Sequence, residues 1–489
     1  MPARTLLWIG TFTCALATAA HAAFTISNAR TRNVTCSSGV CTPTGGNANL
    51  NTGDLQTMLA SADVIVKSNA SAPTLGVLDP LTWASSHRLV LDAYQSLHVR
   101  APIVVEGKAV IVLGTNDGGT NGDYIFETDT SGAITFWDTA STLIINDQRY
   151  TLEKDIKSLA SDAAEHPTGN YALAAAYDAS ADGTYTSAPI PGFDGAFEGL
   201  GNAIQNLTIN SKNNSFGFFG RLAGSVRDLV LENEHLDGNG TAGGLAAVSI
   251  GTVSNVEVTG SVRGGCAGGV IGINEGSILN SGSSVSTRGH SAVGGLVCIN
   301  EGYIAGSFAT GQVVGGSQAG GLIGSNKSGS VYQSFSSGSV QGTSDVGGLI
   351  GAAPHARTNS VVTDCYSTGT ITGSKEAAGG LIGLVHANRL TLRSSFATGM
   401  ISAQENSTVG GVIGTDFGLS NDALYWDLDT TGISNPHQGA GQPLDDPGIT
   451  GLTNAQLRSA LPSGFDPTVW GQNVNINKGW PYLLANPPQ

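Results

Sequence analysis

The sequence predicts an all-β protein: a right-handed parallel β-helix (a solenoid) with short helical caps. The first observation is a Gly-Gly pair followed by branched apolar residues, which recurs through the second half of the chain. The second is composition, since 69 of 489 residues are glycine, 12% are charged and the mean hydropathy is +0.04. Such a chain is too apolar for disorder and too rich in glycine for ordinary helices. Many short strands separated by turns are therefore expected.

The Gly-Gly pairs begin every 25 to 32 residues, from Gly243 to Gly410. Between them, short β-type runs alternate with Gly, Asn and Ser, and no run has the 3.6-residue apolar period of a helix. Each repeat therefore predicts one coil, with its glycines at turns where positive φ is tolerated. The glycines with this structural role are Gly268, Gly269, Gly294, Gly295, Gly320, Gly321, Gly347, Gly348, Gly379, Gly380, Gly410 and Gly411.

Three positions keep their residue type from repeat to repeat, so like residues should stack as ladders. The predicted core ladder is aromatic and consists of Phe308, Phe335, Tyr366 and Phe396. A β-branched ladder follows it, made of Val313, Val340, Ile371 and Ile401. The position before each aromatic residue holds Ser307, Ser334, Cys365 and Ser395, so we interpret Cys365 as a substitute for serine.

Five segments are expected along the chain. Residues 1–22 read as a secretory signal, because Arg4 precedes an apolar run and small residues surround a cleavage site between Ala22 and Ala23. The others are β-rich coils (23–150), a helix and lead-in segment (151–215), the repeats (216–420) and a closing segment (421–489). Helices are expected over Thr151–Ala164 and Leu452–Leu461, the second with Thr453 as N-cap and covering the open end of the stack.

The cysteines and the charge limit the partners. Cys36 and Cys41 are close in sequence and are expected to form a disulfide in an oxidising compartment, whereas Cys266, Cys298 and Cys365 are expected to be small apolar residues of the coil wall. A net charge of −15 argues against nucleic acid and anionic membrane surfaces as partners. No segment after the signal is apolar over the length that a bilayer requires, so no integral membrane segment is expected.

The repeats closely resemble the GLUG motif, with its Gly-Leu-any-Gly core at Gly321–Gly324, Gly348–Gly351 and Gly380–Gly383. Cys298 departs from this pattern by replacing the last glycine of its copy, and Gly282 departs by occupying an aromatic position. The motif is known from filamentous-haemagglutinin-like adhesins and from non-catalytic parts of bacterial immunoglobulin proteases. The resemblance implies a secreted or cell-surface protein of a Gram-negative bacterium, exported with an outer-membrane partner. It also implies an adhesin-like or structural role in attachment to cell surfaces or glycans.

The alternative is a β-helix polysaccharide lyase or glycoside hydrolase. Such an enzyme needs two carboxyl groups about 5 to 10 Å apart, and the best pairs are Asp194 with Glu198 and Asp427 with Asp429. We interpret these acids as turn and cap elements. The segment Gly238–Gly243 matches GxGxxG but lacks the strand-to-helix context of a dinucleotide site. No catalytic, cofactor-binding or metal-binding residues are therefore predicted.

Overall fold

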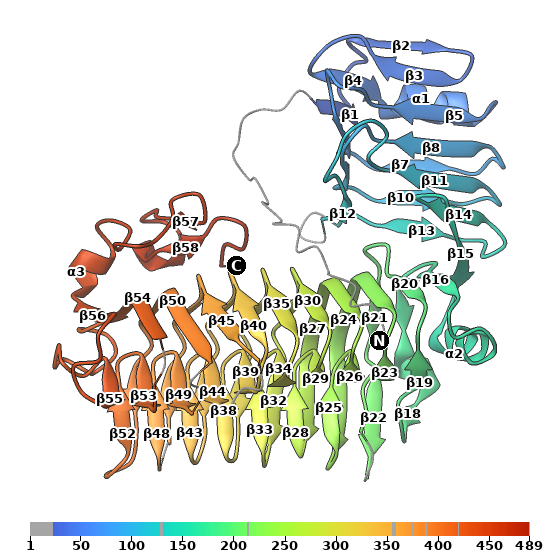
Figure 1. Cartoon of the computed structure of the whole chain (residues 1–489). Helices are drawn as coiled ribbons and strands as arrows, with labels where there is room; N and C mark the ends of the chain where they lie inside the picture. Colours follow the sequence, from blue (N-terminus) through green and yellow to red (C-terminus); the bar gives the residue numbers. More distant parts are fainter. Residues whose placement is uncertain are drawn as a thin grey trace, which may run out of the picture.

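The computed structural model describes residues 23–127, 131–212, 215–354, 358–373, 375–386, 389–418 and 420–488. The chain is 50% strand and 6% helix, and stacked parallel coils form a β-solenoid of about 15 turns (Figure 1). The predicted fold class is thus confirmed. The expected signal, with Ala22, lies outside the described residues, and Ala23 is the first residue of strand β1.

The predicted N-terminal coils form a solenoid of their own, which projects from one end of a longer rod (Figure 1). It has its own apolar core, separate from the core of the rod. Its first sheet is β12 (Tyr124–Phe126), β9 (Leu97–Val99), β6 (Thr74–Val77), β1 (Ala23–Ser27) and β4 (Ala48–Asn51). Its second is β13 (Ile134–Phe136), β10 (Ile103–Val105) and β7 (Leu81–Trp83). Its third face is β14 (Thr142–Ile145), β11 (Val110–Gly114), β8 (Arg88–Asp92), β5 (Val64–Lys67), β3 (Val40–Pro43) and β2 (Val34–Ser37).

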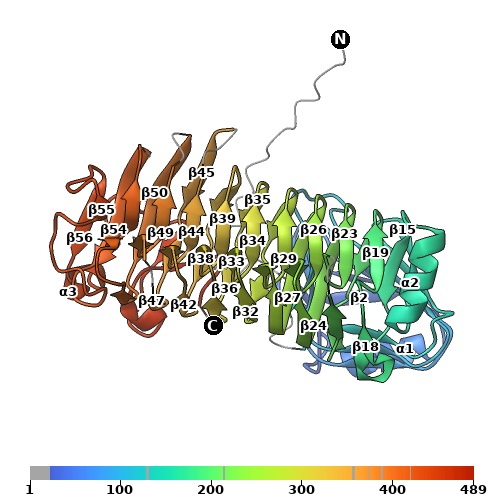
Figure 2. The same cartoon turned by 90° about the horizontal axis from the view of Figure 1, so that it is seen from below.

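The rod begins at β15 (Gln148–Glu153), which pairs with β14 of the first solenoid and with β16 of the rod. Its coils lie side by side along one axis (Figure 2), and each full coil adds a strand to five stacks. Stack 1 is β15, β16 (Asn170–Leu173), β20 (Ala196–Glu198), β24 (Ser225–Gly238), β27 (Thr252–Gly264), β30 (Ser277–Leu279), β35 (Tyr303–Ala305), β40 (Ser330–Tyr332), β45 (Ser360–Thr363), β50 (Leu390–Ala397) and β54 (Ser420–Asp427). The long strands β24 and β27 also run through stacks 2 and 3, and β50 and β54 run through stack 2.

Stack 2 adds β17 (Tyr177–Asp178), β21 (Ala203–Gln205), β31 (Gly282–Ser283), β36 (Phe308–Ala309), β41 (Phe335–Ser336), β46 (Tyr366–Ser367) and, after β54, β56 (Ile449–Leu452). Stack 3 adds β18 (Thr184–Tyr185), β22 (Thr208–Ser211), β32 (Ser286–Gly289), β37 (Val313–Val314), β42 (Val340–Gln341), β47 (Ile371–Thr372) and β51 (Ile401–Ser402). The lead-in segment 151–215 is therefore not separate from the repeats, because it supplies the first coils of the same rod.

Stack 4 is β25 (Thr241–Gly243), β28 (Cys266–Gly268), β33 (Ala292–Gly294), β38 (Gln318–Gly320), β43 (Asp345–Gly347), β48 (Ala377–Gly379) and β52 (Thr408–Gly410). Stack 5 is β19 (Ile190–Phe193), β23 (Phe219–Leu222), β26 (Ala246–Ser249), β29 (Ile271–Asn274), β34 (Val297–Asn300), β39 (Ile323–Asn326), β44 (Ile350–Ala353), β49 (Ile382–Val385), β53 (Ile413–Asp416) and β55 (Ala440–Gln442). A short antiparallel pair, β57 (Trp470–Gly471) and β58 (Tyr482–Leu483), lies outside the stacks.

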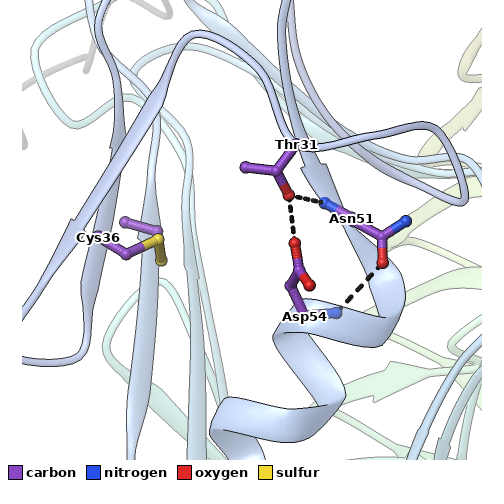
Figure 3. Close-up of a disulfide and its surroundings, with 5 residues drawn as sticks. Thr31, Cys36, Asn51 and Asp54 are labelled. Atoms are coloured by element: carbon purple, nitrogen blue, oxygen red, sulfur yellow. Dashed lines mark hydrogen bonds between the residues drawn. A yellow bond between two sulfur atoms is a disulfide. The ribbon is translucent and has the colours of Figure 1, made fainter.

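Two helices cap the two cores. Helix α1 (Thr52–Leu59) buries Leu55 and Leu59 in the N-terminal core, and the Asn51 side chain caps it by accepting from the backbone N–H of Gly53 and Asp54 (Figure 3). Helix α2 (Ile156–Glu165) buries three side chains in the core of the rod, with Asp155 as N-cap. The predicted helix at Thr151–Ala164 begins later than expected because β15 continues to Glu153, and α1 was not predicted.

The C-terminal end of the rod is closed by a tryptophan and not by the predicted helix. Helix α3 (Asn454–Leu457) is short, with a capping box between Thr453 and Gln456, and its buried Leu457 belongs to a cluster outside the rod core. Trp426 instead fills the interior of the last coil, where the preceding coil has Ala397. Its indole N–H donates to the carbonyl of Ile433 at 3.0 Å. The expectation that Leu452–Leu461 covers the open end is therefore wrong.

The repeat glycines do not provide positive φ, which corrects their predicted role. None of the twelve has a φ in the left-handed region. They are required because the backbone is crowded both within a coil and between coils. A Cβ on Gly320 would lie 1.9 Å from the carbonyl oxygen of Ile323 in its own coil and 2.5 Å from the backbone nitrogen of Gly351 in the next coil. A Cβ on Gly321 would lie 2.1 Å from the carbonyl oxygen of Gly348 in the next coil. The coil-to-coil distance at this corner leaves no room for any side chain.

The left-handed positions lie instead at the corner between stacks 1 and 2, one in each coil. They are Asp228, Asn255, Asn280, Gly306, Gln333, Asp364, Ser394 and Ala423, with φ between 45° and 60°. The serine ladder follows this corner directly. The hydroxyl of Ser334, for example, donates to the carbonyl of Tyr332 at 2.7 Å and accepts from the backbone N–H of Ser307 in the preceding coil at 3.1 Å. Cys365 occupies the same position, as the repeat alignment suggested.

We expect Gly320→Ala to lower the free energy of unfolding by about 1 to 3 kcal/mol, because the added methyl group has to displace backbone of its own and the next coil. Gly192→Ala is the matched control, since a Cβ there meets no atom within 4 Å. Chemical denaturation of both variants measures the difference. Equal stability of the two would contradict the close-approach explanation.

Candidate functional surfaces and buried charges

The aromatic ladder forms as a stack, but it does not lie in the core of the rod. Ring centroids of Phe308, Phe335, Tyr366 and Phe396 are 5.5, 4.8 and 5.1 Å apart, with planes within 13° of parallel. The next residue in each coil, such as Ala309 or Ser336, points inward. Only a small residue fits there, because a Cβ on Gly321 across the coil would already lie 2.8 Å from the Ser336 Cβ. The rings consequently point outward, which corrects the prediction of a core ladder.

A C-terminal segment (residues 453–488) covers the outward rings. Leu457, Phe465, Trp470, Trp480 and Leu483 form a separate apolar cluster with the ladder. Polar contacts fix the segment to several coils. The Trp470 indole N–H donates to Asp364 at 2.9 Å, and the Tyr425 hydroxyl donates to the Ser463 carbonyl at 2.8 Å. The Asn486 amide donates to the Ser307 carbonyl at 3.3 Å.

The two acid pairs singled out in the sequence are each used in structural contacts. Asp194 is bonded to Arg221 at 3.1 Å, while Glu198 is only 2% exposed. Asp427 is buried and accepts from the backbone N–H of Asp429 at 2.9 Å. Asp429 in turn accepts from the N–H of Asn454 at the start of α3, at 2.8 Å. Neither pair presents two carboxyl groups to a shared open space.

A cluster of buried and partly buried polar side chains joins the two solenoids, and no motif in the sequence indicates it. This junction cluster consists of Asp123, Tyr124, Glu198, Arg227 and Asp228. Arg227 of the rod lies over the Tyr124 ring at 4.0 Å and donates to Asp123 at 3.1 Å and to Asp228 at 2.9 Å. The Tyr124 hydroxyl donates to Glu198 at 2.6 Å. The contacts bridge about 100 residues of sequence, so only the fold brings them together.

Burial is the main cause of the pKa shifts of Glu198 and Asp228, the two buried carboxyl groups of the junction cluster. It raises the pKa of Asp228 to about 6 despite the opposing charge of Arg227, and it raises the pKa of Glu198 well above its ordinary value, with the charge of Asp228 adding to the shift. Burial also raises the pKa of Asp345 to about 7 and that of Glu153 to about 7.

Glu234 is the most isolated of the buried acids. A bulge between Leu231 and Glu234 in β24 turns the side chain into the rod, where it is 1% exposed and neither carboxyl oxygen has a hydrogen-bond partner among the described residues. Desolvation alone raises its pKa well above the ordinary value. Glu234 points inward because side chains alternate along the strand and Leu236 is also inward. This orientation could not be predicted from the sequence because it depends on the bulge.

The described residues form two disulfides, of which one was expected. Cys36–Cys41 links the β2–β3 hairpin beside the Asn51 cap of α1 (Figure 3). Cys266–Cys298 links adjacent coils, which corrects the prediction that both are small apolar residues of the coil wall. Cys298 replaces the last glycine of its repeat, and its sulfur reaches the stack 4 corner, where Cys266 aligns with Ala292. The presence of one cysteine in each of two neighbouring repeats was the feature of the sequence that could have indicated this disulfide. Cys365 is free and buried.

Two outward rows on stack 3 are almost free of charge. Exposed residues align from coil to coil as Ser286, Gln312, Ser339, Thr370 and Met400. The second row is Arg288, Val314, Gln341, Thr372 and Ser402. Successive members are about 4.8 Å apart, which is the spacing of strands in a sheet. We call these two sets the stack 3 rows.

Other candidate features are few in the described part of the chain. A shallow depression beside α1 is lined by Asn28, Arg30, Thr31, Asn51 and Asp54, and Thr31 donates to Asp54 at 2.6 Å within it (Figure 3). No group of His, Cys, Asp and Glu side chains among the described residues is arranged to hold a metal ion. No described helix has both the length and the apolar character needed to span a bilayer.

Comparison with known proteins gives limited similarity. No protein-family model matches the chain. Halomucin of Haloquadratum walsbyi (strain DSM 16790 / HBSQ001) is 31% identical over 217 residues, which is 43% of this chain but 2% of that protein. The solved structure of a candidate immunoglobulin A1 protease from Bacteroides ovatus aligns with a TM-score of 0.34 and 17% identity, over 65% of this chain and 86% of that one. Neither similarity defines a family for this chain.

We expect Phe335→Ala to lower the free energy of unfolding by about 3 to 5 kcal/mol, because it opens a cavity between the ladder and the C-terminal segment. Cleavage by a protease within 453–488 should accelerate in this variant more than cleavage within the coils. Phe417→Ala, at a ring that is 58% exposed, is the control. Uniformly faster cleavage throughout the rod would contradict the outward placement of the ladder.

Stability should increase on acidification from about pH 7 to about pH 4.5. The folded chain retains protons on Glu198, Glu234, Asp228, Asp345 and Glu153 at pH values where the unfolded chain, with carboxyl pKa values of about 4, has lost them. Each of these carboxyl groups therefore lowers the free energy of unfolding at pH values above its folded pKa, and this loss disappears as the pH falls below the pKa of the unfolded chain. Thermal melts across this range measure the trend.

Glu234→Leu should raise the melting temperature at pH 7 and flatten this pH dependence, since it removes an unpaired buried carboxyl group. Glu232→Leu, exposed on the same strand, is the control. A melting temperature that falls as the pH falls from 7 to 4.5 would show that the buried acids do not govern the trend.

Proposed function

We propose that this chain is a non-catalytic β-solenoid of the cell surface or secreted medium that attaches to surfaces or glycans through its lateral face. The observation that carries the proposal is the pair of stack 3 rows. They repeat hydroxyl and amide groups at the coil spacing over five successive coils. Linked sites that are individually weak raise the overall affinity without a deep pocket.

Three further points support an adhesin-like role. The acidic side chains that could have served a polysaccharide lyase or hydrolase are engaged in an ion pair, in a turn and at a helix cap. The repeats also resemble the GLUG motif of exported adhesins. Two disulfides fit a chain that folds in an oxidising compartment.

The test compares two triple variants of equal charge for attachment to glycan arrays and to intact cells. Ser339→Glu, Thr370→Glu and Gln341→Glu place three charges in the stack 3 rows, and attachment should fall by at least about tenfold because several linked contacts are lost together. The control triple is Thr35→Glu, Thr57→Glu and Ser61→Glu, all exposed on the N-terminal solenoid.

Attachment that falls equally in both triples would contradict a role for the stack 3 rows, and absence of attachment by the unmodified chain would contradict the proposed function. Release of reducing ends or unsaturated products from neutral or acidic polysaccharides by the unmodified chain would contradict its non-catalytic character.

A further inference from the structure

Tyr303 and Tyr332 form an aromatic pair on the outer surface of stack 1. Their neighbours Ile304 and Val331 are fully buried, so alternation along the strands turns both tyrosines outward. The ring centroids are 5.2 Å apart with planes tilted by 31°, and Tyr303 is 39% exposed.

Small residues surround the two rings. In register, Tyr303 lies between Ser277 and Ser330, and Tyr332 lies between Ala305 and Thr363. The rings therefore rise from a floor of short side chains and present aromatic area that no larger neighbour on their own strands covers. We call this the tyrosine platform.

Folding makes little use of the tyrosine platform. Neither hydroxyl is hydrogen bonded to another described residue, and neither ring belongs to an apolar core cluster. The aromatic ladder on the neighbouring stack 2 is different, because the C-terminal segment covers it. Asn486 of that segment donates to the carbonyl of Gln333, the residue next to Tyr332. An aromatic pair left uncovered next to a covered ladder points to a ligand from outside the chain.

The charges near the tyrosine platform and on the chain as a whole favour an uncharged ligand. The charged residues closest in sequence, Glu301 and Lys327, neutralise each other at 3.6 Å. The chain as a whole carries a net charge of −15, which repels acidic saccharides. The C–H face of a pyranose ring is apolar and packs on aromatic rings, while its hydroxyl groups can bond to serines such as Ser277 and Ser330.

We infer that the tyrosine platform binds uncharged oligosaccharides by stacking a pyranose ring on Tyr303 and Tyr332. This inference rests on the proposed attachment function and names its ligand class. The stack 3 rows then contribute avidity, and the platform contributes the preference for neutral pyranosides.

The experiment is affinity electrophoresis of the full chain in gels that contain neutral glucans (cellulose-type, laminarin-type and amylose-type), with polygalacturonate as the acidic comparator. Retardation by at least one neutral glucan and none by polygalacturonate is expected. Tyr303→Ala with Tyr332→Ala should weaken retardation at least tenfold, whereas Tyr303→Phe with Tyr332→Phe should retain most of it because the rings remain. Trp137→Ala, at a ring 67% exposed on the N-terminal solenoid, should behave as the unmodified chain.

The outcomes separate the two proposals. If the unmodified chain is retarded and the double alanine variant is retarded equally, the platform inference is overturned while attachment stands. If polygalacturonate retards the chain as strongly as the neutral glucans, the ligand class is wrong. If the chain attaches to cells but no neutral glucan retards it, the platform is excluded as the saccharide site. If it attaches to no surface, the proposed function fails as well.

Discussion

The close approach of coils at the Gly-Gly corner is the constraint on which the rest of the rod depends. A Cβ at Gly320, Gly347 or Gly379 would lie within 2.0 Å of a carbonyl oxygen of its own coil and 2.5 to 2.7 Å from a backbone atom of the next coil. Across each of these coils the opposite wall is also near, because a Cβ on Gly321 would lie 2.8 Å from the Ser336 Cβ. From Ser283 to Ala397, the inner side of stack 2 accordingly holds only Ala or Ser. The aromatic residue of each repeat is then turned outward, where it needs the C-terminal segment as a cover. One steric limit thus determines both the interior and the exterior of the repeat.

The sequence predicted the features that depend on periodicity. The coil, its register, the serine position of Cys365 and the hairpin disulfide all follow from spacing or from short sequence separation. Features that depend on which side of a strand faces the core were harder to predict from the sequence. The aromatic ladder was placed inside because large apolar side chains usually are, and the opposing glycines that exclude it lie in another stack.

Contacts between residues far apart in the sequence could not be predicted from the sequence. Arg227 and Asp123 are about 100 residues apart, and nothing in either local pattern indicates the other. The Cys266–Cys298 bond was obscured for a related reason, since its separation of 32 residues differs from the 26 residues between Gly268 and Gly294, so the two cysteines do not occupy equivalent positions of the repeat. The stack 3 rows are intermediate: the predicted coils imply outward rows, but the register that aligns Gln312 with Ser339 and Thr370 comes from the fold.

The C-terminal segment has a mechanical consequence. The last coil of a solenoid has only one neighbour, so under tension it is the first to peel away. Here the chain turns back after that coil and runs along the rod, contacting Tyr425, then Asp364, and finally Ser307. A force that pulls on the terminal coil is therefore shared among coils far from the end, and detachment requires many contacts to break together. A rod anchored at one end and loaded at the other gains resistance to shear from this return path.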